Sequence, residues 1–447
     1  MKKLKLSLFL VVSSTLVFGQ GQYKVLWSFL GTPTDGFEPV SGLVFDRSGN
    51  LYGTTSRGGS GVVPYGVVFE LSPQGEGTWI ETVLYNFCSV TACLDGAAPM
   101  AGLVFDSKGN LYGTTYAGGT NDCENGFFGC GTVFELSPPS LPGGNWTEAV
   151  LYNFCSDGLG GGCKDGAEPT SHLTLRDGNL YGTTTTGGTG GFVNGCCLAG
   201  TVFELSPGND SWTHAVLYNF CADGHNYTCP DGSGPQAGVT FDDTGNLYGT
   251  TKAGGSFHGL GNGTVYKLSP SFSGWTETLL SGHDAPAGEA APLGEITVDR
   301  LGDVYGTFSM GGTSSAGGVF RLSQKRGSPK IFSFNGNNGQ GPSAGVLLES
   351  KTATLYGTTS TGGTAQAGTV FGISGSGTES VLYNFCSKRG CVDGEGPLGN
   401  LITDADGNLY GTASFGGANG NGVVFEISPP DAPNRRSNQT SFSKQPK

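Results

Sequence analysis

The most regular candidates for chemistry in this chain are five aspartates that recur in one local context. Each stands directly before a glycine, and a proline follows three residues after that glycine; the five are Asp35, Asp95, Asp165, Asp231 and Asp393. Carboxylates gathered at the mouth of a channel suit Ca²⁺, a cationic ligand or a sugar. The alternative is that each aspartate caps its own turn, which is a common use of this side chain.

One of the five histidines is a further candidate because of its place in the repeat described below. His172 replaces the glycine that opens the presumed inner strand of other units, so we predict that it faces the channel and binds a ligand there. A structural histidine with satisfied hydrogen bonds is the alternative. Paired carboxylates for glycoside hydrolysis stay open as a hypothesis, because the two partners can come from different units.

The cysteines fall mostly into local pairs. Four units place one cysteine directly after Asn-Phe and a second shortly before Asp-Gly, whereas the other units lack both. This pattern favours disulfides in an exported protein, and zinc is the alternative. The predicted pairs are Cys88–Cys93, Cys155–Cys163, Cys221–Cys229 and Cys386–Cys391, with Cys123–Cys130 as a fifth pair within one loop. The adjacent Cys196 and Cys197 form a vicinal disulfide, Cys196–Cys197, or stay reduced.

These residues belong to a unit that occurs seven times. Leu-Tyr-Gly-Thr or a close variant begins at Leu51, Leu111, Leu180, Leu247, Val304, Leu355 and Leu409. Each copy is followed by a Gly-Gly pair and then by a segment such as Gly-Thr-Val-Phe-Glu-Leu-Ser-Pro at residues 131–138. Self-similarity at spacings of 51 to 69 residues is typical of propellers and other repeat folds.

Each unit reads as four short strands. In the second unit, residues 102–106 and 110–115 flank a turn, and two further strands are predicted at 132–137 and 146–154. Four strands per unit predict the blade of an all-β propeller, with a linear solenoid of hairpins as the alternative. With 81 glycines in 447 residues, long helices are disfavoured.

The ends of the repeat region favour a ring over a solenoid. The last unit lacks its fourth strand, and a spare strand at residues 24–29 precedes the first unit. We therefore predict a seven-bladed β-propeller of four-stranded antiparallel blades over residues 20–430, closed by the N-terminal strand. Closure removes the sheet edges that a solenoid would leave exposed.

Alternating strand direction places the cysteine-bearing loops on one face. The loop after the second strand and the connection after the fourth strand lie on that face, and their length insertions concentrate in residues 88–235. Elaborated loops on a rigid scaffold are common binding sites. Neutral drift in loop length is the alternative, because exposed loops tolerate insertion at little cost.

The two ends of the chain differ in composition from the repeats. Residues 1–19 combine a basic start with a short apolar stretch, which predicts a signal peptide rather than a retained anchor. Residues 431–447 form a polar tail that we expect to be disordered. Without these ends the chain keeps 16 basic and 35 acidic residues, so we expect it to bind neither nucleic acid nor membrane. The signal peptide predicts a secreted or periplasmic protein, and we expect a monomer.

The unit resembles the GloVer tandem repeat of bacterial "choice-of-anchor" exported proteins. The resemblance rests on Leu-Tyr-Asn-Phe, Asp-Gly-x-x-Pro, Gly-Asn-Leu-Tyr-Gly-Thr-Thr and Gly-Thr-Val-Phe-Glu-Leu-Ser-Pro, and it covers residues 24–430. It implies export and a surface-sorting segment, but no particular activity. The tail has no apolar sorting helix, so release into the medium or periplasm is expected as readily as anchoring.

Two functional hypotheses follow. The first is a non-catalytic module that binds a glycan or a surface protein through the disulfide-bearing face, without a cofactor other than a possible Ca²⁺ ion. The second is an extracellular polysaccharide hydrolase or lyase with carboxylates at the channel mouth. A purely structural spacer is a third reading, which applies if neither binding nor turnover is found.

Overall fold

The computed structural model describes residues 22–31, 33, 35–60, 64–121, 123, 129–141, 143–157, 162–190, 199–222, 229–255, 262–282, 290–323 and 330–429. The predicted signal peptide, the predicted polar tail and the Cys196–Cys197 pair lie outside these residues. In the described part of the chain, no helix has the length and hydropathy needed to cross a membrane.

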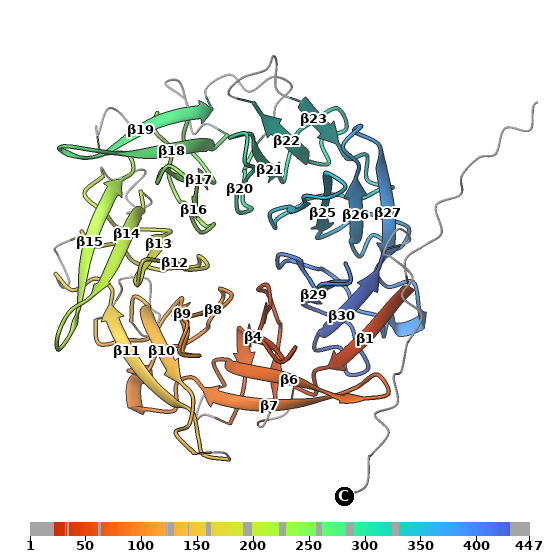
Figure 1. The fold of residues 1–447 in the computed structure, drawn as a ribbon, viewed down its shortest axis with the longest axis horizontal. Coiled ribbons are helices and arrows are strands. Elements are labelled where there is room, and N and C mark those ends of the chain that lie inside the picture. The colour runs from red at the N-terminus through yellow and green to blue at the C-terminus, as the bar shows by residue number, and fades with distance from the viewer. Residues whose placement is uncertain are drawn as a thin grey trace, which may run out of the picture.

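Seven four-stranded antiparallel sheets are arranged in a ring (Figure 1), so the protein is an all-β, seven-bladed propeller as predicted. The first three blades are β3(Val44–Phe45) β4(Leu51–Thr55) β6(Val67–Gly75) β7(Thr78–Asn86), β8(Val104–Phe105) β9(Leu111–Thr115) β10(Thr132–Ser137) β11(Thr147–Asn153), and β12(Thr174–Arg176) β13(Asn179–Thr184) β14(Thr201–Pro207) β15(Trp212–Asn219). The next three are β16(Thr240–Phe241) β17(Leu247–Thr251) β18(Thr264–Ser271) β19(Gly274–Ser281), β20(Thr297–Val298) β21(Val304–Phe308) β22(Gly318–Leu322) β23(Lys330–Ser333), and β24(Leu347–Glu349) β25(Thr354–Thr359) β26(Thr369–Ile373) β27(Glu379–Asn384). The seventh is β28(Ile402–Thr403) β29(Leu409–Ala413) β30(Val423–Ser428) β1(Gln22–Ser28), and β2(Gly36–Phe37) pairs with β5(Arg57–Gly58) beside the first blade.

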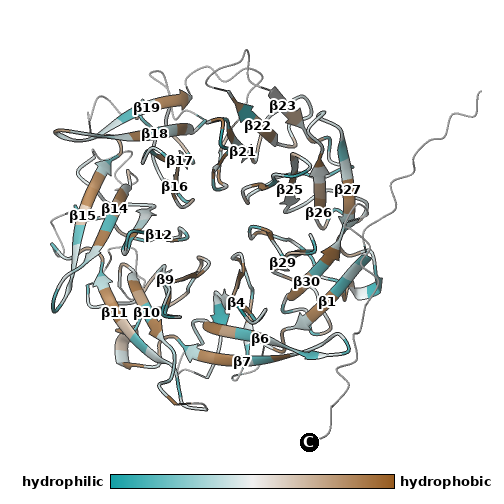
Figure 2. Ribbon diagram, viewed as in Figure 1, coloured by the Kyte–Doolittle hydropathy of each residue, from teal (hydrophilic) through white to brown (hydrophobic). Residues whose placement is uncertain are grey.

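Aromatic pairs between neighbouring blades form the repeating unit of the core. A phenylalanine at the end of an outer strand meets the third-strand aromatic ring of the next blade edge-on, with ring centroids 4.9 to 5.2 Å apart. The pairs are Phe29–Phe69, Phe87–Phe134, Phe154–Phe203, Phe220–Tyr266, Phe334–Phe371 and Phe385–Phe425. Edge-to-face geometry of this kind adds about 1 kcal/mol to the burial of each pair. Apolar and polar bands alternate along the outer strands (Figure 2), as sheets packed face to face require.

The glycine of the Leu-Tyr-Gly-Thr motif makes room for these rings. A Cβ atom on Gly113 would lie 2.6 Å from Cζ of Phe134 and 3.0 Å from Cδ2 of Leu103. The glycine of the motif is therefore needed because the second strand packs closely against the third-strand ring, not because the chain turns there.

The N-terminal strand closes the ring. β1 pairs antiparallel with β30 from Gln22↔Ser428 to Ser28↔Val423, and the two strands lie side by side at the junction of the chain's ends (Figure 1). The Phe29 amide continues the pairing by donating to the Gly422 carbonyl at 3.1 Å. The predicted closure is therefore confirmed, with the strand beginning two residues before the predicted start.

Deleting residues 22–30 should lower the melting temperature of the whole molecule in a single cooperative transition. The deletion removes the outer strand of the seventh blade and the fully buried Phe29, and it exposes β30 as a sheet edge. Calorimetry on the full chain and on the deletion variant measures this. A local, low-amplitude transition with the main one unmoved would contradict the closed ring.

Candidate functional site

Two sets of loops meet on one face of the ring, which we call the loop face. The loop after a second strand donates its glycine amide to the carbonyl that precedes Asp-Gly in the connection from the previous blade. At the four cysteine-bearing connections these bonds are Gly119 N to Cys93 O, Gly188 N to Cys163 O, Gly255 N to Cys229 O and Gly417 N to Cys391 O, at 2.7 to 2.9 Å. In these four units the Gly-Gly pair is therefore the contact between the two loops.

Only glycine fits the first position of that pair. Gly118 has a φ of +82°, and a Cβ atom there would lie 2.5 Å from Cα of Gly96 and 2.6 Å from O of Cys93. Both neighbours are backbone, which cannot move aside as a flexible side chain can.

Five disulfides brace the loop face. The structure contains Cys88–Cys93, Cys123–Cys130, Cys155–Cys163, Cys221–Cys229 and Cys386–Cys391. Each closes a loop of only five to eight residues in sequence separation, so each restrains a local connection rather than the ring.

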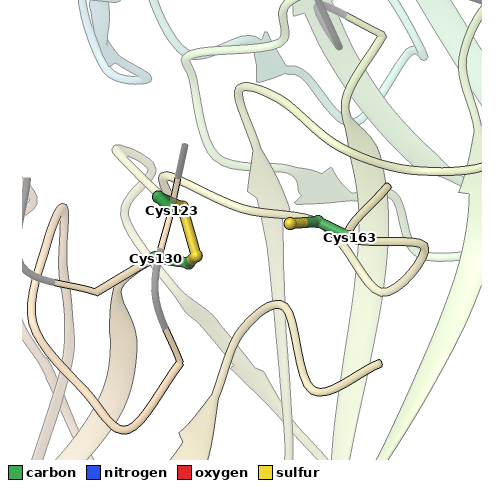
Figure 3. Close-up of side chains that lie close together, drawn as sticks. All are labelled: Cys123, Cys130 and Cys163. Carbon is green, nitrogen blue, oxygen red and sulfur yellow. A yellow bond between two sulfur atoms is a disulfide. The ribbon is translucent and has the colours of Figure 1, made fainter. Parts of the chain in front are cut away.

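Two of these disulfides lie next to each other. The sulfurs of Cys123, Cys130 and Cys163 lie within 4.8 Å of one another, and Figure 3 shows the Cys163 sulfur directed toward the Cys123–Cys130 bond. Because Cys163 is itself bonded to Cys155, the cluster offers no thiolate to a metal. It brings the second-strand loop of the second blade against the connection that enters the third.

The five repeated aspartates act as acceptors within their own connections. Asp95 Oδ2 accepts hydrogen bonds from the Tyr85 hydroxyl (2.9 Å), the Ser89 amide (2.9 Å) and the Ser89 hydroxyl (2.7 Å). Asp393 repeats this arrangement with Tyr383 and Ser387. Burial opposes ionisation of Asp393, but the hydrogen bonds from Tyr383 and Ser387 hold its pKa below the usual value.

The remaining three aspartates follow the same plan. Asp165 accepts from the Tyr152 hydroxyl and the Ser156 amide, Asp231 from the Tyr218 hydroxyl and the Cys221 amide, and Asp35 from the Leu30 amide. None of the five lines the central cavity. N–H donors to Oδ2 of each carboxylate favour a turn-capping role over a calcium site, because a cation would have to compete for that oxygen.

The wall of the central channel begins with seven equivalent positions, one per blade. Four are glycine and three carry polar side chains; in ring order they are Gly42, Gly102, His172, Gly238, Glu295, Gly345 and Asn400. His172 therefore faces the channel as predicted. The fold does not require a side chain at this position, since four of the seven blades have glycine there.

The three polar side chains meet across the intervening glycines. His172 Nδ1 lies 3.6 Å from Glu295 Oε1, and the Asn400 side-chain amide donates to Glu295 Oε2 at 2.7 Å. His172 Nε2 lies 3.1 Å from the Leu103 carbonyl, and Asn400 Oδ1 accepts from the Gly345 amide at 2.8 Å. His172 and Glu295 keep 37 % and 27 % of their side-chain surface exposed, so the cluster remains open to a ligand.

The cluster lies in a cavity of about 530 Å³ along the ring axis. At the loop face, the mouth is formed by the residues that follow the repeated prolines: Val40, Met100, Thr170, Gln236, Leu293, Ser343 and Leu398. Blades 7, 1, 2 and 5 contribute apolar side chains at this level, and blades 3, 4 and 6 contribute polar ones. This volume lies in the range of ligand pockets, and the wall presents both apolar and polar side chains.

Two of these residues escaped the sequence interpretation. Glu295 and Asn400 replace the same glycine as His172, so comparison of all seven units at this position would have found them. A third channel residue, Ser343, lies within a Gly-x-Ser-x-Gly stretch at 341–345. This stretch leads into an inner strand of an antiparallel blade, not through a strand-to-helix elbow, so it lacks the context that activates a serine nucleophile.

Of the other histidines, only His214 lies among the described residues. It is stacked on Tyr152 with ring centroids 4.3 Å apart, away from the channel. His225, His258 and His283 lie outside the described residues.

The fold and its repeats define the class of this protein as a β-propeller built from tandem units. The chain belongs to the Gloeobacter/Verrucomicrobia repeat family, whose sequence profile matches residues 12–259, 122–332 and 260–443. This confirms the resemblance recognised in the repeat. A search of the curated proteins found no match.

Several solved structures resemble the chain. A protein of Bacteroides uniformis ATCC 8492 proposed to be a 6-phosphogluconolactonase is 13 % identical, with a TM-score of 0.46 and coverage of 76 % of this chain and 82 % of its own. A protein of unknown function from Dyadobacter fermentans DSM 18053 is 12 % identical, with a TM-score of 0.42 and coverage of 92 % and 99 %. A further proposed 6-phosphogluconolactonase, from Bacteroides fragilis NCTC 9343, is 14 % identical, with a TM-score of 0.41 and coverage of 84 % and 88 %.

Gly118→Ala should destabilise the protein by about 1–3 kcal/mol, because it combines a strained φ with a clash against backbone. Gly245→Ala is the matched control: its φ of +88° is similar, but no atom lies within 4 Å of the added Cβ. Urea unfolding of both variants measures the difference. Equal losses would show that the contact between the loops contributes nothing beyond the φ strain.

Removing calcium should leave the melting temperature unchanged, because donors already surround the repeated aspartates. Thermal melts of the intact protein with excess chelator and with added Ca²⁺ provide the measurement. A rise of several degrees on adding Ca²⁺ would contradict the turn-capping role and revive the predicted metal site.

Proposed function

We propose that this propeller is a non-catalytic binding module whose ligand, a glycan or a segment of a surface protein, enters the central channel from the loop face. The observation that carries the proposal is the His172–Glu295–Asn400 cluster. These polar side chains occupy positions that four other blades fill with glycine, so the ring does not require them.

The energetics of the cluster support a binding role. Partial burial of a carboxylate and an imidazole costs free energy unless each is paired. Here Glu295 is paired with His172 and with the Asn400 side-chain amide, and His172 is also paired with the Leu103 carbonyl. The resulting group is rigid, because its members are held by the Leu103 carbonyl and the Gly345 amide. Rigid polar groups beside apolar side chains can fix the orientation of a ligand that has both polar and apolar groups.

The hydrolase or lyase hypothesis has less support. Hydrolysis of a glycoside usually needs two carboxyl groups about 5–10 Å apart. Among the described residues that line the cavity, Glu295 is the single carboxylate, and the five repeated aspartates lie elsewhere.

We further propose that the protein works as a monomer outside the cytoplasm, in the periplasm or the medium. Five disulfides in the described residues support an oxidising compartment. The acidic surplus of the chain supports the proposal that neither nucleic acid nor an anionic membrane is its partner.

Replacing the cluster by the residue that the other blades use tests the binding role. We expect the triple variant His172→Gly, Glu295→Gly, Asn400→Gly to keep the fold and to bind a wild-type ligand at least tenfold more weakly, which is about 1.4 kcal/mol. Ligands are first identified with the full chain on glycan and surface-protein arrays, and dissociation constants are then measured by calorimetry.

Arg47→Ala provides the control, since Arg47 lies in an exposed turn on the opposite face. Unchanged affinity in the triple variant would place the ligand outside the channel. Product formation from a polysaccharide, lost on Asp165→Asn and Asp231→Asn, would overturn the non-catalytic proposal.

A further inference from the structure

The junctions between neighbouring blades repeat one arrangement of three side chains near the loop face. An aromatic residue late in an outer strand faces the repeated aspartate of the connection that follows. A third residue faces the same aspartate from the next outer strand. It stands four positions before that strand's own late residue, as Glu81 stands before Tyr85. At one junction the Tyr218 hydroxyl lies 3.1 Å from Asp231 Oδ2 and 3.3 Å from Glu277 Oε2.

Three junctions place a glutamate against the aspartate, and we call them the Asp–Glu junctions: Asp35–Glu81, Asp95–Glu148 and Asp231–Glu277. Asp35 is only 3 % exposed and faces Glu81, and Asp35 Oδ1 and Glu81 Oε1 are both buried without a hydrogen-bond donor. Glu148 Oε1 and Glu277 Oε1 are likewise buried without a donor. Two ionised carboxylates in such contact would repel each other, and their facing oxygens would have no hydrogen between them.

The other described junctions show what this position requires. They pair Asp165 with His214, Asn338 with Glu379, and Asp393 with Tyr23. At the first two junctions, one member offers a carboxylate and the other offers a group able to donate. At the third, the Tyr23 hydroxyl donates to the main-chain carbonyl of Asp393, and Tyr23 brings no second carboxylate to the junction. The junction between β19 and β23 involves residues outside the described part of the chain.

One of these junctions shows a compensating replacement. Phe332 stands where most outer strands have tyrosine, so it cannot donate to the connection. There the aspartate is replaced by Asn338, whose side-chain amide donates to Glu379 Oε2 at 3.3 Å. Although both the tyrosine and the aspartate are replaced at this junction, it still has one donor, Asn338, and one carboxylate, Glu379.

We propose that the glutamate of each Asp–Glu junction carries a proton in the folded protein and donates it to the aspartate. The closed ring therefore holds three protons that the unfolded chain releases at neutral pH. Protonation makes these junctions equivalent to the Asn–Glu junction, with one donor facing one carboxylate.

The surroundings of the glutamates agree with this assignment. Burial, followed by the charge of the facing aspartate, raises the pKa of Glu148 and of Glu277 to about 7. The groups that face Glu148 are Asp95 and Tyr85, and the Tyr85 hydroxyl only partly offsets the rise. Asp231 and Tyr218 face Glu277, with the buried Tyr266 nearby.

At the Asp35–Glu81 and Asp165–His214 junctions, burial likewise favours the uncharged form of the residue that faces the aspartate. Burial and then the charge of Asp35 raise the pKa of Glu81, with Trp27 from β1 facing Asp35. Burial lowers the pKa of His214 to about 4, against the opposing charge of Asp165, so this ring stays neutral near pH 7.

The sign of the pH dependence follows from the direction of these shifts. A glutamate whose pKa is raised on folding binds a proton more tightly in the folded state, so its contribution to stability is complete below its unfolded pKa, near 4.5. That contribution is lost as the pH rises toward and through the pKa of the glutamate in the folded protein. The ring should therefore lose stability from about pH 4.5 up to the folded-state pKa values of about 7 to 8, and change little above them.

The test replaces the three glutamates by glutamine, an isostere that donates at every pH. The melting temperature of the full-length wild type should fall by about 5 °C between pH 6 and pH 9. That of the triple variant Glu81→Gln, Glu148→Gln, Glu277→Gln should fall much less, with a small remaining fall from Glu379 and Glu426, whose pKa burial also raises. At pH 9 the variant should be the more stable protein. A parallel fall in both proteins would overturn the proposal.

A matched control removes the same number of charges elsewhere in the repeat. Glu70→Gln, Glu135→Gln, Glu204→Gln changes the equivalent third-strand glutamates, which accept hydrogen bonds from Ser72, Ser137 and Asn179, respectively. We expect this variant to keep the wild-type pH dependence. If it also loses most of that dependence, the effect comes from net charge rather than from the Asp–Glu junctions, and the proposal is wrong.

Infrared spectroscopy of the wild type gives a second readout that does not depend on any variant folding. The carbonyl stretch of protonated carboxyl groups should be present in the folded protein at pH 6 and should disappear as the pH is raised to 9. Its absence at pH 6 would show that the glutamates are ionised and would likewise overturn the proposal.

Discussion

Pairing of β1 with β30 is the constraint on which the rest of the structure depends. It supplies the seventh blade with its outer strand, and only a closed ring brings seven inner strands around one channel. Phe29 meets Phe69 because of this closure, and Trp27 meets Asp35 for the same reason. The first Asp–Glu junction and the last blade are thus consequences of one antiparallel contact between the two ends of the chain.

Much of this architecture can be predicted from the sequence, because the repeat places the same physical demand on every unit. The strand at residues 132–137 has its predicted bounds, since Gly131 and Pro138 delimit it. The strand predicted at 102–106 is shorter, Val104–Phe105, because the residues before it line the channel instead of pairing. Local disulfides were also predictable, since both partners lie in one connection.

The site was only partly predictable. His172 was found by comparing equivalent positions, but Glu295 and Asn400 become partners only after the sixth blade has folded between their blades. The sequence predicts the repeated aspartates as ligands, whereas in the structure their oxygens accept hydrogen bonds from tyrosine hydroxyls and backbone amides. The charge state of Glu148 depends on burial between two blades, and this burial cannot be predicted from the sequence of one repeat unit.

Closure by the first strand also sets an order of events during synthesis. β1 is among the first parts of the chain to be made, and β30 is among the last, so β1 must wait unpaired while six blades form. Such a pairing between distant segments is slow to form, and until it does both strands present open edges to other chains. The nascent protein therefore has its greatest need of chaperone protection just before the last blade is complete.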